Sequence, residues 1–231
     1  MRKNRSLIVI PALNEEETIE QVVSSILKYG DVLVVDDGSS DSTSNMAKSA
    51  GALVAINKVN LGYDEALNVG FQFAKLHGYD NMLTFDADGQ LPDYAVPIFI
   101  NALDEKTALV TGLRNNIPRL SEKLFAKFCN MTLGFQDPFC GLKAYNISFC
   151  QRFENFGEYK SLGTDLCLKL IVAGHSFKTI KITVAERNGI SRFGHRYKAE
   201  YKLLRPLVIG AMLIIKTLIL RKLNNYKVIR K

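Results

Sequence analysis

Short, wholly apolar segments alternate with segments of helical periodicity in this chain, and this alternation limits the fold more than any other feature. After the first apolar segment, residues 7–10, comes a loop at 11–14, and then Ile19, Val22, Val23 and Ile26 recur at helical spacing. The scheme repeats with apolar segments at 32–35, 53–56, 82–85 and 108–114 and with helices at 64–77 and near 97–103. Strands that are apolar throughout indicate an α/β fold, with a mostly parallel sheet covered by helices on both faces.

The order is less regular beyond Arg114. Helices are expected near 121–131 and 164–173, on either side of a strand at 141–145. Residues 176–187 then alternate apolar and polar side chains, as a half-exposed strand does. The simplest division is one domain over residues 1–198 and a C-terminal appendage over residues 199–231.

Polar side chains follow the predicted strands at the point where each strand ends. These residues are Asn14 and Glu15, Asp36 and Asp37, and Asp86 and Asp88. Open α/β sheets bind ligands beyond the carboxyl ends of their strands, so the three pairs are expected to line one acidic crevice. Asp86 and Asp88 form an Asp-x-Asp arrangement, whose oxygen ligands suit Mg²⁺ or Mn²⁺ together with substrate phosphates. The alternative for this arrangement alone is a solvated turn.

Charge is unevenly distributed along the chain. Residues 178–231 hold 14 Lys and Arg against 2 Asp and Glu, a net charge of +12, whereas the whole chain carries +7. A basic end suits nucleic acid, anionic lipid or an anionic substrate. Nucleic acid is not favoured, because aromatic side chains do not interleave these charges as a stacking platform requires.

The appendage contains an apolar run at 207–220 that Lys216 interrupts. A helix of that length reaches about 21 Å, short of a hydrocarbon core of about 30 Å. We therefore expect an amphipathic helix on an anionic membrane surface, with lysines reaching the head groups. A helix buried in the domain or in a homo-oligomer interface is the alternative, and a true span is least favoured.

Cysteine usage and the N-terminus indicate a cytoplasmic protein. The cysteines are too widely spaced for a CxxC metal pattern or a dense disulfide framework, so reduced thiols are expected; they are Cys129, Cys140, Cys150 and Cys167. The apolar run after the basic N-terminus is short, contains Pro11 and continues into glutamates, unlike a secretory signal.

Four segments occur in an order and spacing that resemble a known family: IPALNEEETI, VVDDGSSDST, NLGYDEALNVGFQFA and FDADGQLPD. They are similar to those of the inverting glycosyltransferases of family 2, which have the GT-A fold. DPFCGLKAY and RNGISRFG extend the resemblance to residues 6–198 and toward the dolichyl-phosphate mannose synthase and bacterial polyprenyl-phosphate branch.

The resemblance implies a UDP- or GDP-linked sugar as donor and Mg²⁺ or Mn²⁺ as cofactor. The implied donor-binding residues are Pro11, Leu13, Asn14, Glu15, Asp36, Asp37, Gly62 and Asp86. The metal and diphosphate would be held by Asp86 and Asp88, with Gln90 as a further contact. Arg114 and Arg119 match basic residues that face the sugar phosphate and the acceptor, and Arg187, Ser191 and Arg192 match a phosphate-facing loop. Asp88, Arg114 and Asp165 are the implied catalytic residues.

The chain departs from the family before the last core helix, where LGTDLCLKL keeps only Asp165 of a more acidic segment. A hydroxyl nucleophile needs a general base there. A phosphate monoester does not, because its second pKa is about 6. The favoured function is therefore metal-dependent transfer to a polyprenyl phosphate at the cytoplasmic face of a membrane. The alternatives are transfer to a hydroxyl of a surface glycan with Asp165 as base, and a non-catalytic protein that binds nucleotide sugar or a membrane surface.

Overall fold

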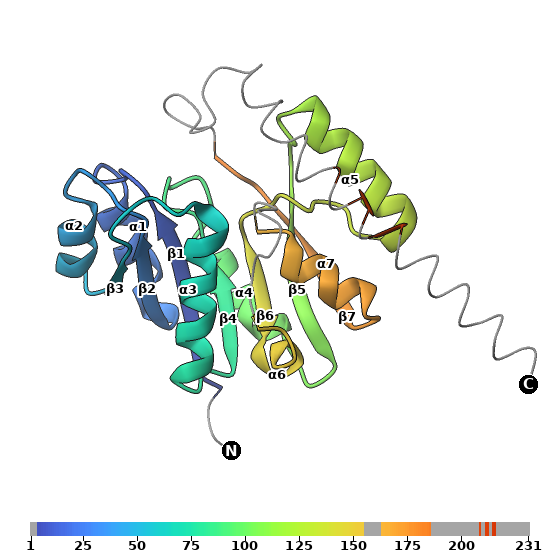
Figure 1. Cartoon of the computed structure of the whole chain (residues 1–231), viewed down its shortest axis with the longest axis horizontal. Coiled ribbons are helices and arrows are strands. Elements are labelled where there is room, and N and C mark those ends of the chain that lie inside the picture. Colours follow the sequence, from blue (N-terminus) through green and yellow to red (C-terminus); the bar gives the residue numbers. More distant parts are fainter. Residues whose placement is uncertain (1–3, 155–162, 186–207, 209–210, 213, 216–231) are drawn as a thin grey trace, which may run out of the picture.

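The computed structural model describes residues 4–154, 163–185, 208, 211–212 and 214–215. Within them, one mixed sheet of order β3-β2-β1-β4-β6-β5-β7 has helices on both faces (Figure 1). The α/β fold with a mostly parallel sheet is confirmed. Arg187, Ser191 and Arg192, and most of the C-terminal appendage, lie outside the described residues.

The first half of the chain forms the parallel part of the sheet. Its strands are β1 (Ser6–Ala12), β2 (Asp31–Asp36), β3 (Leu53–Ile56) and β4 (Asn81–Thr84). The helices between them are α1 (Ile19–Ile26), a short 3₁₀ turn η1 (Leu27–Tyr29), α2 (Thr43–Ser49) and α3 (Tyr63–Leu76). Each strand therefore ends at the same edge of the sheet, as the alternation predicted.

The second half adds one strand of opposite direction. Its strands are β5 (Thr107–Arg114), β6 (Lys143–Asn146) and β7 (Ser176–Ile182). Its helices are α4 (Ala95–Ala102), α5 (Leu120–Leu133), α6 (Ile147–Cys150) and α7 (Asp165–Val172). The strand β6 lies between β4 and β5 and is antiparallel to both, so its first residues lie at the edge where β4 and β5 end.

The sheet separates two apolar layers, and β1 contributes to both because successive side chains point to opposite faces. Leu7 and Val9 join the layer under α3, α5, α6 and α7. Ile8 and Ile10 join the layer under α1, α2 and α4. All of these β1 side chains are fully buried, which explains why the strand is apolar without alternation.

The first loop begins later than the sequence predicted. Pro11 was expected to open the loop but lies inside β1, buried and opposite Val35 of β2. The pairing of β1 with β4 ends at Val9 and Thr84. Pro11, which has no backbone N–H, lies beyond the residues of β1 that pair with β4, so that pairing does not require an N–H from it. The loop that faces the crevice therefore starts at Leu13.

The described part of the appendage packs on the domain. Ala211 and Ile214 contact the apolar layer that contains Phe125 of α5, and Ile214 is fully buried. Val208, Met212 and Ile215 remain about half exposed or more. Among the residues described, no helix has both the length and the apolar character needed to cross a membrane.

Candidate functional site

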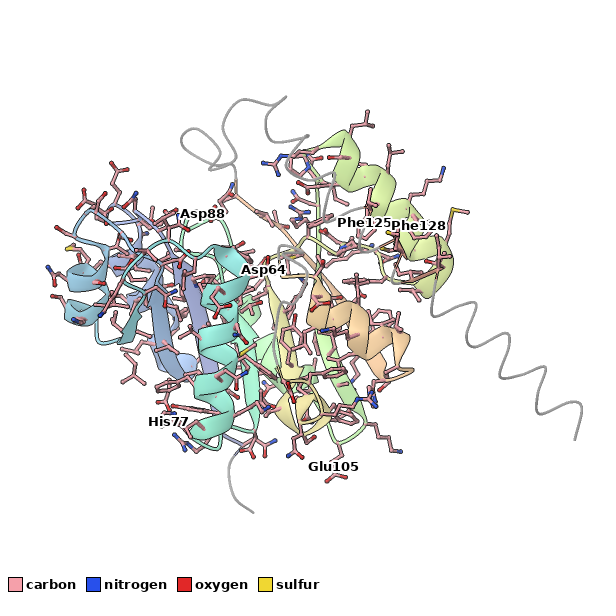
Figure 2. All side chains as sticks on the ribbon, viewed as in Figure 1. Asp64, His77, Asp88, Glu105, Phe125 and Phe128 are labelled. Atoms are coloured by element: carbon pink, nitrogen blue, oxygen red, sulfur yellow. The ribbon has the colours of Figure 1, made fainter. Side chains whose placement is uncertain are left out.

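The predicted acidic residues gather at the carboxyl edge of the parallel strands. In Figure 2, Asp88 and Asp64 lie toward this edge, whereas His77 and Glu105 lie at the opposite edge. The loops after β1, β2 and β4 contribute Asn14, Asp37 and Asp86. The structure therefore brings the three predicted pairs to one end of the sheet.

Direct hydrogen bonds join the loops after β1 and β2. The side-chain oxygen of Asn14 accepts from the backbone N–H of Ser40 at 2.9 Å, and the backbone N–H of Asn14 donates to Ser39 Oγ at 2.9 Å. Asn14 adopts a φ of 52°, a conformation that asparagine tolerates better than most side chains. The backbone N–H of Glu15 donates to Thr43 Oγ1 at 2.8 Å, and Glu15 is buried. These hydrogen bonds fasten the loop after β1 to the loop after β2 and to the start of α2.

Asp36 and Asp37 are buried and hold neighbouring loops. Asp36 accepts from the backbone N–H of Ser39 at 2.8 Å and from the hydroxyl of Ser44. Asp37 Oδ1 accepts from Asn57 Nδ2 at 2.8 Å and from the backbone N–H of Leu61 at 3.0 Å, and its Oδ2 accepts from that of Gly62 at 2.7 Å. Both oxygens of Asp37 are therefore used inside the protein, and its contact with a nucleotide base stays a prediction.

Gly62 ends the loop that Asp37 holds and precedes α3. A Cβ added at this position would meet no atom of the described chain within 4 Å. The backbone there faces open space, which agrees with the predicted approach of a donor without testing it.

Asp86 and Asp88 are half-buried on either side of the buried Ala87. Tyr63 Oη donates to Asp86 Oδ1 at 3.2 Å, and the backbone N–H of Gln90 donates to Asp88 Oδ1 at 3.1 Å. The carbonyl of Ala87 accepts from Thr18 Oγ1 at 2.7 Å, which fastens the loop to the start of α1. The two carboxylates are therefore oriented by neighbours rather than left in a solvated turn.

The donor set fits a hard cation that keeps part of its shell for a substrate. Within the described residues, no three His, Cys, Asp or Glu side chains converge as a metal site. Mg²⁺ usually binds through only one or two carboxylates, with water and substrate phosphates as the other ligands. The amide nitrogen of Gln90 donates to the carbonyl of Ala185 at 3.0 Å, so only its Oε1 can face a cation. Asp86, Asp88 and Gln90 thus match the chemistry expected of a magnesium or manganese site.

Gln90 also ties the Asp-x-Asp loop to the segment after β7. The backbone carbonyl of Gln90 accepts from the N–H of Ala185 at 3.0 Å. Together with the bond from the Gln90 side chain to the Ala185 carbonyl, this makes two hydrogen bonds between the two residues. Arg187 follows two residues later in the sequence. The chain therefore enters the predicted phosphate-facing loop from a point beside the acidic site.

Arg114 and Arg119 belong to a buried ionic network. Arg114 makes a bidentate contact with Asp137, Nε to Oδ2 at 2.8 Å and Nη2 to Oδ1 at 2.9 Å. Glu122 joins the two arginines, accepting from Arg114 Nη2 at 2.9 Å and from Arg119 Nη1 at 2.5 Å. Burial lowers the pKa of Arg114, but hydrogen bonding and the charge of Asp137 outweigh it and raise that pKa overall. Both arginines are held in fixed, charged positions.

Asp165 is the first residue of α7 and is 2% exposed. Its Oδ2 forms an ion pair with Lys169 Nζ at 2.9 Å, one turn along the helix. The preceding turn is held at Gly163, whose backbone N–H donates to Asp64 Oδ1 at 2.7 Å and whose carbonyl accepts from Lys143 Nζ at 3.1 Å. Asp165 is thus held in one position by its ion pair and by the contacts of the preceding turn. Its role as a base stays a prediction.

Comparison with known proteins decides the family. The profile of the family described as Glycosyl transferase family 2 matches residues 7–127, more than half of the chain. The chain belongs to glycosyl transferase family 2. The matched range includes every described donor and metal candidate, from Pro11 to Gln90, and also Arg114 and Arg119.

Relatives of this family 2 protein include enzymes named for a lipid-linked acceptor. It is 26% identical over 211 residues to the undecaprenyl-phosphate 4-deoxy-4-formamido-L-arabinose transferase of Edwardsiella ictaluri, a match of 81% of this chain and 62% of the relative. It is 40% identical over 92 residues to an uncharacterized protein of Methanocaldococcus jannaschii, covering 39% of this chain and 38% of that one. The chain spans less than two thirds of the length of these curated relatives.

Solved structures confirm the GT-A fold of this family 2 chain. The glucosyl-3-phosphoglycerate synthase of Mycobacterium tuberculosis, in complex with Mn²⁺, UDP and glucosyl-3-phosphoglycerate, superposes with a TM-score of 0.71 at 20% identity. The match covers 90% of this chain and 80% of that one. At this identity the likeness shows the fold alone.

Sequence reasoning missed the residues that hold the site together. They are Tyr63, Asp64, Glu122, Asp137 and Lys143. Asp137 and Lys143 both lie within the quoted segment DPFCGLKAY, which was the one available signal for them. Nothing in their spacing says that one contacts Arg114 and the other Gly163.

The surroundings of Cys140 do not activate its thiol. The side chain is fully buried, and burial, with the nearby charge of Asp137, raises the pKa of its thiol to about 12. A thiol of this kind is not a nucleophile at neutral pH. All four cysteines are free and buried.

Proposed function

We propose that this protein transfers a sugar from a nucleoside diphosphate sugar to a polyprenyl phosphate at the cytoplasmic face of a membrane. The observation that carries the proposal is the oriented pair Asp86 and Asp88, tied through Gln90 to the segment that enters the basic loop. The basic segment proposed to receive a phosphate acceptor follows two residues after the clamp at Ala185 in the sequence. The relatives named as undecaprenyl-phosphate transferases support the acceptor class.

The acidic half would act on the donor. Asp86 and Asp88, with Gln90, would hold Mg²⁺ or Mn²⁺. When bound, such a cation stabilises negative charge on a departing diphosphate. The structural neighbours solved in complex with UDP and Mn²⁺ or Mg²⁺ support UDP as the first nucleotide to test.

The basic half would act on the acceptor. Arg114 and Arg119 are positioned by Glu122, and Arg187 and Arg192 follow the clamp at Ala185 in the sequence. Arginine binds phosphate oxygens through charge-assisted, often paired hydrogen bonds. A phosphate acceptor is already ionised at neutral pH, so its attack on the anomeric carbon would need no deprotonation by the protein.

The outer face of α5 supports contact with a membrane surface. Leu120, Leu124 and Met131 are 63%, 62% and 77% exposed and recur at helical spacing, and Lys123 and Lys127 are exposed among them. Apolar side chains interspersed with lysines suit the boundary of an anionic bilayer. Arg119 directly precedes this helix, so a lipid-linked phosphate would meet the site from the same side.

The deciding experiment is a donor and acceptor panel. UDP- and GDP-sugars are incubated with Mn²⁺ or Mg²⁺ and with either polyprenyl phosphate in vesicles or soluble oligosaccharides, and release of nucleoside diphosphate is measured. Release that depends on polyprenyl phosphate supports the proposal, whereas release only with oligosaccharides supports a hydroxyl acceptor. No release with any pair supports a binding protein.

Asp88→Ala is the matching site variant and is expected to abolish metal-dependent release. Asp93→Ala is its control, because Asp93 lies on the same loop and forms only a 3.5 Å ion pair with Lys28 in exposed surroundings. Unchanged release by Asp88→Ala would contradict the metal assignment. Asp165→Asn would lower the rate of nucleoside diphosphate release far more with a hydroxyl acceptor than with a phosphate acceptor, since only the hydroxyl needs a base.

A further inference from the structure

The first turn of α3 contacts both halves of the site. Asp37 fixes its start by accepting from the backbone N–H groups of Leu61 and Gly62. The next two side chains, Tyr63 and Asp64, then reach in different directions: one contacts the loop after β4, and the other contacts the turn before α7. Neither residue is among the candidates that the sequence indicated.

Tyr63 reaches the donor side. Its hydroxyl donates to Asp86 Oδ1 at 3.2 Å. Gly141 lies against the same carboxylate, since a Cβ built there would stand 2.0 Å from Asp86 Oδ2. The carboxylate is therefore held by a hydrogen bond at one oxygen and by close backbone packing at the other.

Asp64 reaches the acceptor side. It is 7% exposed and accepts from the backbone N–H of Gly163 at 2.7 Å. Lys143, 3% exposed, donates to the carbonyl of Gly163 at 3.1 Å, so both polar groups of this residue are held by buried charged side chains. Gly163 has a φ of 72°, and Asp165 begins α7 two residues later. The position of Asp165 thus depends on Asp64.

We propose that Tyr63 and Asp64 are positioning residues with separable roles, in which Tyr63 orients Asp86 for the donor metal and Asp64 places the Gly163–Asp165 turn for the acceptor. The proposal rests on the proposed function for the meaning of donor and acceptor. It explains why an ionisable side chain is buried at position 64, because burial of a carboxylate is costly unless it makes specific hydrogen bonds.

Binding measurements test the role of Tyr63 without turnover. Isothermal titration with UDP and with GDP, each with Mn²⁺, is made on the wild type, Tyr63→Phe and Asp64→Asn. Partners of metal ligands typically change metal affinity by roughly 10- to 100-fold when removed. We expect Tyr63→Phe to weaken Mn²⁺-dependent binding by about 10-fold or more, and Asp64→Asn to leave it within about 2-fold of the wild type. Equal effects of the two variants would overturn the separation of roles.

Hydrogen exchange tests the role of Asp64 independently of any ligand. The Gly163 amide is expected to exchange faster in Asp64→Ala, and to stay protected in Asp64→Asn, whose side-chain oxygen still accepts, and in Tyr63→Phe. Unchanged protection in Asp64→Ala would overturn the proposal. If the wild type binds neither nucleotide, the proposed function fails, while the exchange experiment still decides whether Asp64 holds the turn.

Turnover then separates positioning from general damage. With polyprenyl phosphate as acceptor, Asp64→Ala should raise the acceptor KM by about 10-fold or more at unchanged donor KM, and Asp64→Asn should restore most of the loss, in keeping with the cost of removing groups that orient a site. A parallel loss of donor binding and turnover in Asp64→Ala, without rescue by Asp64→Asn, would mean that the residue only maintains the fold.

Discussion

Gly141 and Asp86 lie closer together than any side chain at position 141 would permit. The atom nearest to a built Cβ is the carboxylate of Asp86, which is the movable end of a side chain. An added methyl group would therefore displace the carboxylate more readily than the backbone. At the scale of single residues, the candidate metal site depends on the absence of a side chain at Gly141, in the segment that leads into β6.

Gly141→Ala is expected to keep the fold but to weaken Mn²⁺-dependent nucleotide binding by about 10-fold or more, as loss of ligand orientation does. Titration with UDP and Mn²⁺, alongside thermal unfolding, measures the two effects. Gly78→Ala serves as control for binding, since a Cβ there meets no atom of the described chain within 4 Å and the strain at its φ of 66° falls on stability alone. Normal binding by Gly141→Ala would show that Asp86 is not needed in its present position.

Arg114 is the second residue whose neighbours determine the effect of a substitution. Asp137 and Glu122 are 1% and 2% exposed, so Arg114→Ala would leave buried carboxylates without their main countercharge. Loss of one partner of a buried ion pair typically costs about 3–5 kcal/mol of unfolding free energy. Urea unfolding measures this cost.

Arg119→Ala is the matched control, because Arg119 contacts Glu122, whereas Arg114 contacts Glu122 and also makes the bidentate contact with Asp137. We expect it to cost clearly less stability than Arg114→Ala while lowering the rate with a phosphate acceptor. Equal destabilisation by the two variants would contradict the claim that Arg114 is the main countercharge of Asp137 and Glu122.

At the scale of elements, α5 has two faces with different partners. Its inner face buries Glu122, Phe125, Ala126 and Cys129 against the domain. Its outer face presents large apolar side chains and lysines, although a helix on a water-exposed surface usually has polar residues there. The sequence analysis assigned membrane contact to the appendage and did not identify this face.

Leu124→Glu combined with Met131→Glu is expected to reduce sedimentation with anionic vesicles severalfold, because two apolar contacts are replaced by charges that the head groups repel. Sedimentation with vesicles of anionic and of neutral lipid measures the effect. Leu76→Glu is the control, since Leu76 is 82% exposed on α3. If all three proteins sediment alike, α5 does not contact the bilayer.

At the scale of the whole molecule, the thiols report on the intact fold. They lie in both apolar layers, and burial raises the pKa to about 12 for Cys140, about 12 for Cys150 and about 11 for Cys167, and also raises that of Cys129. Because a raised pKa keeps a thiol protonated, almost no thiolate exists at pH 8.

All four cysteines should therefore react with a disulfide reagent at pH 8 only as the protein unfolds. The absorbance of the released thiolate against urea concentration should follow the unfolding curve measured by circular dichroism. Rapid reaction of one thiol in the native protein would show that part of the apolar interior opens independently.

The strands and the acidic edge were predictable because their signals are local. Residues 7–10 are apolar without alternation because both faces of β1 are covered. Asp36 ends β2, and Asp86 comes two residues after β4. The reversed direction of β6 was not predictable, since a four-residue strand carries no local mark of orientation. The contact between Asp64 and Gly163 joins residues 99 positions apart, which no single sequence reveals.

The reversed strand β6 also helps to set the distance between the loop that carries Asp86 and the turn at Gly163. Thr84, two residues before Asp86, is paired in β6 with Lys143, the residue that holds Gly163. Neighbouring strands stand about 4.8 Å apart, and their backbone hydrogen bonds fix that spacing. The separation between Asp86 and the turn at Gly163 is thus set by the spacing of β4 and β6 together with the side chain of Lys143. Under the proposed function, substitutions in the surrounding loops would then change which sugar or lipid is bound while leaving this separation unchanged.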